Sequence, residues 1–164
     1  SSPTGACLER TMRLTGFSDY ALRMLMFAAS AEGRLITIEE TARTFGLPKT
    51  HLNKVANVLT RGGFLIGIRG RAGGLMLARR PETIRIGDVM RLTEPDFALV
   101  ECFSTGNQCV LTNCCKLSGV LNEALASFHR TLDSYTLADI VLAPTDFFPV
   151  GHRAGKSLAL EVAS

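Results

Sequence analysis

The chain has 164 residues, of which 46% are hydrophobic and 20% are charged, and it has no tryptophan. This length fits one domain, or one small domain with an appendage, and the hydrophobic fraction excludes an intrinsically disordered chain. No stretch approaches the ~20 apolar residues that cross a bilayer, and no basic segment followed by an apolar one marks an export signal. We therefore expect a globular cytoplasmic protein with no membrane partner.

The net charge of +3 hides an uneven distribution. Residues 12–91 carry 13 Lys and Arg against 6 Asp and Glu, whereas residues 92–164 carry 4 against 8. A basic first half favours a module that binds a polyanion such as nucleic acid. The alternative is that these charges only solvate the surface.

The first half of the chain predicts three helices. Residues 1–11 are small and polar, so we expect a leader or a cloning scar, with Met12 as the natural start. Apolar residues at helical spacing predict a helix over Phe17–Ala31. Thr37 and Glu40 form a capping-box pattern that opens a second helix, Ile38 to about Phe45. Gly46 fits its left-handed C-terminal position.

A third helix follows after a very short turn. Pro48 suits its first turn and Gly62 ends it, and its buried face is expected at Leu52, Val55, Ala56, Val58 and Leu59. Two helices joined by a tight glycine turn are typical of a helix-turn-helix, in which the second helix reads the major groove. The side chains placed to do so are Lys49, Thr50, His51, Asn53 and Lys54. A helical hairpin without DNA binding is the alternative.

A β-hairpin comes next, with strands over Phe64–Ile68 and Leu75–Arg80. Its turn, residues 69–74, contains three glycines together with Arg69 and Arg71. Such a basic tip can place arginine in a narrow minor groove. A phosphate-binding loop is disfavoured, because no Gly-Lys-Ser/Thr occurs and no helix follows directly.

The second half predicts a short helical turn over Ile86–Arg91 and a long amphipathic helix over Leu117–Tyr135. A helix of this length needs a partner for its apolar face, and a dimer interface is the natural candidate. Packing back onto its own domain is the alternative. Residues 138–143 add a short helix, and the tail from Pro144 is expected to be mobile.

Four of the five cysteines lie within 14 consecutive residues, namely Cys102, Cys109, Cys114 and Cys115. Clustered thiols without an export signal indicate metal or redox chemistry rather than a disulfide scaffold. Six residues separate Cys102 from Cys109, and five separate Cys109 from Cys115, which is wider than the usual zinc pairs. Spacing alone leaves zinc, an iron–sulfur cluster and thiol redox sensing open. No nucleophile–base pair, cofactor fingerprint or catalytic carboxylate pair suggests an enzyme.

Several motifs together resemble the Rrf-type winged-helix regulators, over about residues 12–143. They are Met12-Arg13-Leu14-Thr15 with Ser18-Asp19-Tyr20-Ala21-Leu22-Arg23, His51-Leu52-x-Lys54-Val55, Arg69-Gly70-x-x-Gly73-Gly74, Ile86-Gly87-Asp88-Val89, Val100-Glu101-Cys102-Phe103 and Cys115-Lys116-Leu117. The branch most similar to this chain is that of the nitric-oxide-sensing repressors.

The resemblance implies a homodimeric transcriptional repressor that binds double-stranded operator DNA. It implies an iron–sulfur cluster, 4Fe–4S favoured over 2Fe–2S, held by Cys102, Cys109 and Cys115. The fourth ligand would be Asp19 of the other subunit, and nitric oxide would release the DNA. The alternatives are a regulator of the same fold that responds to iron or cluster status, and a zinc-stabilised interaction module.

The expected fold is mainly α with a small β-wing: a winged helix-turn-helix domain and a long dimerisation helix. The expected segments are residues 1–11 as leader, 12–91 as DNA-binding domain, 92–116 as cluster-binding loop, 117–143 as dimerisation helix region and 144–164 as flexible tail.

Overall fold

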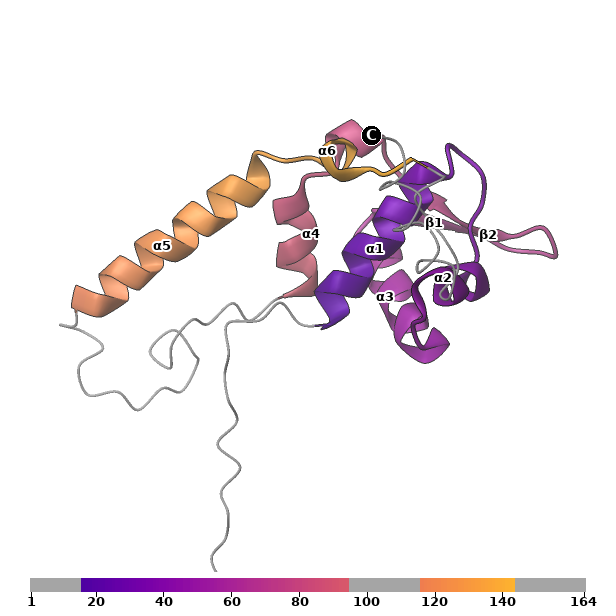
Figure 1. Ribbon diagram of the computed structural model, residues 1–164, viewed down its shortest axis with the longest axis horizontal. Coiled ribbons are helices and arrows are strands. Elements are labelled where there is room, and N and C mark those ends of the chain that lie inside the picture. The colour runs from indigo at the N-terminus through magenta and orange to yellow at the C-terminus, as the bar shows by residue number, and fades with distance from the viewer. Residues whose placement is uncertain (1–15, 95–115, 144–164) are drawn as a thin grey trace, which may run out of the picture.

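The structure is a computed structural model that describes residues 16–94 and 116–143 (Figure 1). The expected leader, the four clustered cysteines and the expected flexible tail lie outside the described residues. Within the described ranges no helix is long and apolar enough to cross a membrane. The elements, in chain order, are α1 Gly16–Ser30, α2 Ile38–Phe45, α3 Lys49–Arg61, β1 Leu65–Ile68, β2 Gly74–Leu77, the 3-10 turn η1 Pro81–Thr83, α4 Ile86–Thr93, α5 Lys116–Asp133 and α6 Leu137–Ile140.

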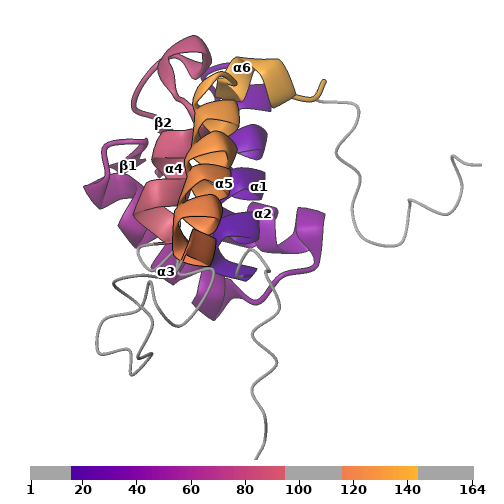
Figure 2. The same ribbon diagram turned by 90° about the vertical axis from the view of Figure 1, so that its left-hand side faces the viewer.

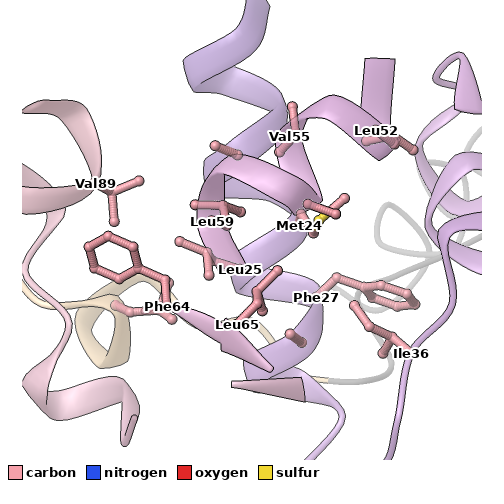
Figure 3. Packing of buried hydrophobic residues seen from close by; sticks show 14 of the residues in the cluster. Met24, Leu25, Phe27, Ile36, Leu52, Val55, Leu59, Phe64, Leu65 and Val89 are labelled. Atoms are coloured by element: carbon pink, nitrogen blue, oxygen red, sulfur yellow. The ribbon is translucent and has the colours of Figure 1, made fainter. Parts of the chain in front are cut away.

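The core forms around α1, which packs against α3, α4 and β2. Met24 and Leu25 of α1 are fully buried, as are Leu52 and Leu59 of α3. Figure 3 shows these side chains gathered between the two helices, with Phe64 and Val89 closing one end. The apolar spacing read from the sequence marks the buried face of α3 correctly, except that Val58 is only half-buried.

The helix-turn-helix has the predicted turn and one difference at its cap. Gly46 adopts φ 67° and ends α2, where a Cβ would be strained. The Thr37 side chain accepts a hydrogen bond from the Glu40 backbone N–H at 3.0 Å, as expected. The other half of the capping box is wrong, because the Glu40 carboxylate instead accepts from the Arg34 guanidinium at 2.9 and 3.1 Å. An ion pair with Arg34 is available only because the preceding loop turns back toward α2.

The wing is a two-stranded antiparallel hairpin, with Leu65 opposite Leu77 and Ile68 opposite Gly74. Leu75 also forms a bridge with Ile36, in the loop before α2. The second strand is shorter than predicted and stops at Leu77. Arg79 leaves the strand direction and folds back, donating to the Gly63 carbonyl at 3.0 Å and lying 4.8 Å over the Phe64 ring.

The glycines at the end of the turn are required by close backbone approach. A Cβ on Gly73 would lie 2.9 Å from the Gly70 carbonyl oxygen, and one on Gly74 would lie 2.5 Å from the Ile36 carbonyl oxygen. Both distances are shorter than side chains tolerate. A larger residue at position 73 or 74 would therefore force the backbone of the wing apart.

Helix α5 stands apart from the rest of the molecule and contacts it through α4 (Figures 1 and 2). Arg91 of α4 donates to both carboxylate oxygens of Asp133, at 2.8 and 2.6 Å, and so ties the end of α5 to the domain. After α5 the chain returns to the core. Leu137 is fully buried there, and Thr136 and Asp139 form a capping box that opens α6.

Helix α6 is shorter than the predicted 138–143 segment. Val141 already has extended backbone angles, φ −63° and ψ 134°, and this ends the helix after Ile140.

Candidate nucleic-acid interface and metal centre

The start of α3 carries the predicted DNA-reading side chains. The five residues are exposed, while Leu52 and Val55 between and beside them are fully buried. The helix is thus anchored by one face and presents the other to solvent. The exposed residues are Lys49, Thr50, His51, Asn53 and Lys54.

Lys49 already has an acidic partner. Its ammonium lies 2.8 Å from the carboxylate of Glu39, which stands in the first turn of α2. The hydrogen bond from Lys49, together with its charge, lowers the pKa of Glu39 below the ordinary value. A phosphate group that approaches Lys49 must therefore compete with Glu39. Sequence reasoning missed this contact between the first turn of α2 and the start of α3.

The wing tip carries the two predicted minor-groove side chains. Arg69 and Arg71 are both exposed, and Gly70 between them has φ 115°, a conformation that favours glycine. The Gly73 backbone N–H donates to the Gly70 carbonyl at 3.0 Å and closes the tip. Figure 1 shows the wing tip and α5 at opposite ends of the molecule.

Asp19, the one predicted metal ligand among the described residues, lies in the first turn of α1. Its side chain is 46% exposed, and its carboxylate pairs with Arg23, one turn along, at 2.9 Å. An acid at this position also suits the positive end of the helix dipole. The Arg23 guanidinium in turn lies 5.9 Å from the centre of the Phe45 ring at the end of α2.

The residues on either side of Asp19 reach two other helices. The Ser18 hydroxyl is buried, lies 2.7 Å from the Thr93 hydroxyl and donates to the Glu94 carboxylate at 2.7 Å. The Tyr20 ring stacks on His51 at the start of α3. Three consecutive residues of α1 therefore contact α4, α1 itself and α3. The periodicity of the sequence gives no sign of the contacts with α3 and α4, because they join residues 31 to 76 positions apart.

The described residues offer one part of the predicted cluster site. They contain no group of three or more His, Cys, Asp or Glu side chains that could hold a metal ion, and Cys102, Cys109, Cys114 and Cys115 lie outside them. Glu94 is the last described residue before the cysteines. Its carboxylate accepts a hydrogen bond from Ser18, the neighbour of Asp19 in α1. The half-exposed carboxylate of Asp19 fits the role of a ligand, because a group outside this chain can reach it.

Comparison with known proteins identifies the family. The model of the Rrf2 family, described as iron-dependent transcriptional regulators, matches residues 14–143. The HTH-type transcriptional regulator NsrR of Bacillus subtilis is 48% identical over 132 residues, which cover 79% of this chain and 90% of that protein. The protein of the same name from Geobacillus kaustophilus is 47% identical over 132 residues, with the same coverage.

The chain belongs to the Rrf2 family of transcriptional regulators. Solved structures agree on the fold of this Rrf2 protein. IscR of T. potens has a TM-score of 0.63 at 24% identity, over 79% of this chain and 85% of that one. CymR of B. subtilis has a TM-score of 0.62 at 24% identity, over 79% and 96%.

Membership settles the broad function of this Rrf2 protein. It is a DNA-binding regulator of transcription and not an enzyme. The mainly helical architecture with a two-stranded wing confirms the fold class expected from the sequence.

Proposed function

We propose that this Rrf2 regulator is a homodimeric repressor that binds operator DNA and releases it in response to nitric oxide, sensed through a 4Fe–4S cluster. The observation that carries the proposal is the position of Asp19. Its carboxylate is half-exposed in the first turn of α1, where a group of a second subunit can reach it. The 48% identity to an NsrR protein supports it.

In this proposal residues 92–116 form the cluster-binding loop. Cys102, Cys109 and Cys115 of one subunit and Asp19 of the other hold the cluster. Iron bound by thiolates would supply the place where nitric oxide binds. A carboxylate is a hard ligand and a weak partner for such a soft site, so Asp19 is the ligand most readily lost. Arg23 then holds the released carboxylate, as it does in the structure.

Helix α5 supports the proposed dimer. None of its residues is buried, and Leu117 and Val120 are 59% and 61% exposed. An amphipathic helix of 18 residues whose apolar side is only partly covered is poorly stable alone in water. A second copy of α5 would cover that side. It would also set two α3 helices a fixed distance apart, as operator half-sites roughly 34–36 Å apart require.

The DNA contacts follow from the exposed side chains. The start of α3 would read base edges in the major groove, with His51 and Asn53 placed for base contacts and Lys49 and Lys54 for phosphates. Arg69 and Arg71 of the wing would enter the adjacent minor groove.

The deciding experiment is the visible spectrum of protein purified without oxygen, followed by titration with nitric oxide. We expect broad absorption near ~400 nm that nitric oxide removes or reshapes. The same samples are tested for binding to a DNA fragment selected by this protein from a random pool, and affinity should fall as the absorption changes. A colourless protein that stays colourless after reconstitution and contains zinc would refute the proposal.

Asp19→Ala tests the bridging role. The variant should bind the selected DNA with the affinity of cluster-free protein and should no longer respond to nitric oxide. Glu82→Gln is the matched control, because Glu82 is an exposed acid in η1, away from the proposed site. Nitric-oxide-sensitive binding that persists in Asp19→Ala would contradict the bridge.

A further inference from the structure

The contact between Tyr20 and His51 joins the proposed ligand helix to the proposed DNA-reading helix. The two ring centres are 6.2 Å apart and the ring planes differ by 23°. This lies within the range of centre distances, about 4.5–7 Å, over which aromatic pairs interact. Tyr20 is half-buried against the core, whereas His51 is exposed. The stack therefore has one fixed side and one side turned to solvent.

The position of Tyr20 in the chain makes this contact informative. It directly follows Asp19, and residues so close in a helix move together, because one hydrogen-bonded turn holds them. Ser18, on the other side of Asp19, is held by Thr93 and Glu94 of the α4 end. The hydrogen bonds of Ser18 therefore oppose a displacement of Asp19, and such a displacement moves the Tyr20 ring relative to His51.

We propose that Tyr20 is a positioning residue that couples the state of Asp19 to His51 on α3. This inference rests on the proposed function, and it names the residue through which Asp19 would affect the DNA-reading helix. When Asp19 pairs with Arg23, as in the structure, the Tyr20 ring holds His51 in the stack. When Asp19 is engaged as a ligand, the first turn of α1 and the Tyr20 ring shift, and His51 is released to contact DNA. Two arrangements that a ligand biases are what a switch requires.

The test must separate coupling from mere packing. The quantity to measure is the ratio of DNA affinities of cluster-loaded and cluster-free protein, at one salt concentration, on the selected DNA fragment. A residue that only stabilises the fold changes both affinities alike and leaves this ratio unchanged. A coupling residue changes the ratio.

Tyr20→Leu removes the ring, and Tyr20→Phe keeps it without the hydroxyl. We expect Tyr20→Leu to reduce the ratio by about threefold to tenfold, the range that stacked aromatic contacts support, while the visible spectrum of the loaded protein is retained. Tyr20→Phe should keep the wild-type ratio. Phe17→Leu is the matched control, because Phe17 is a half-buried ring of the same helix that packs against the core.

His51→Ala gives a second route that does not threaten folding, since His51 is exposed. It should lower the ratio as much as Tyr20→Leu, and the double variant should show no further loss. If either single variant changes both affinities by the same factor, the inference is overturned and the proposed function stands. If wild-type protein forms no cluster, or binds DNA equally well with and without it, the proposed function and this inference both fail.

Discussion

Gly74→Ala should destabilise the wing, and the structure gives the expected loss of folding free energy. The added Cβ would lie 2.5 Å from the Ile36 carbonyl oxygen and 3.1 Å from the Leu35 Cβ. Backbone atoms cannot rotate away, so the strand must separate from Ile36. Two backbone hydrogen bonds join Ile36 and Leu75, at 2.9 and 2.7 Å, and both are strained by that separation. At about 0.5–1.5 kcal/mol each, their loss would cost about 1–3 kcal/mol.

The assay is thermal unfolding followed by circular dichroism, with Gly67→Ala as the matched control. Gly67 lies in the opposite strand, and its Cβ would meet only the Leu75 side chain at 3.8 Å, an ordinary contact. We expect Gly74→Ala to lower Tm by about 3–10 °C and Gly67→Ala to leave it unchanged or slightly raised. If the two variants unfold at the same temperature, the argument from close backbone approach is refuted.

Three further predictions concern charged side chains. Glu39→Gln frees Lys49 for phosphate, so DNA binding should tighten, and the slope of log affinity against log salt should steepen by about 0.9. Arg69→Ala should weaken DNA binding and reduce the preference for A·T pairs, if the wing enters the minor groove. The Arg91 hydrogen bonds lower the pKa of Asp133, so this pair stabilises the fold above the ordinary carboxyl pKa of 3.8. That contribution is lost as the pH falls through the lower folded value, and Asp133→Asn should therefore reduce Tm at pH 7 but not in strong acid.

Each of these predictions has a clear contrary result. An unchanged salt slope in Glu39→Gln would mean that Lys49 meets no phosphate. If Arg69→Ala binds DNA with the affinity and selectivity of the wild type, the wing does not enter the minor groove. A Tm difference between wild type and Asp133→Asn that persists in strong acid would show that charge is not its cause.

The sequence predicted local structure well at positions where the conformation or hydrogen bond depends on the residue type itself. Gly46 had to adopt a left-handed conformation, and Thr37 had to cap α2, so both ends of that helix could be placed. The apolar spacing of α3 marked its buried face for a similar reason: a helix repeats every 3.6 residues whatever packs against it.

Contacts between distant residues could not be read in this way. The fold-back of Arg79 onto Gly63, the Ser18 contact with Glu94 and the stack of Tyr20 on His51 depend on how whole helices pack. Lys49 was singled out correctly as exposed, but its pairing with Glu39 depends on the angle between α2 and α3. The cysteine ligands and the domain boundaries stay predictions.

Helix α5 makes protein concentration part of the proposed switch. A single chain buries no residue of α5, so in the proposed dimer the stability of this helix would depend on the association of two chains, which is governed by mass action. Residues 95–115, which carry the cysteines, end where α5 begins. Dilution should therefore destabilise α5. A cell that makes few copies of this regulator would hold it largely as single chains, which could neither assemble the proposed site nor span two half-sites.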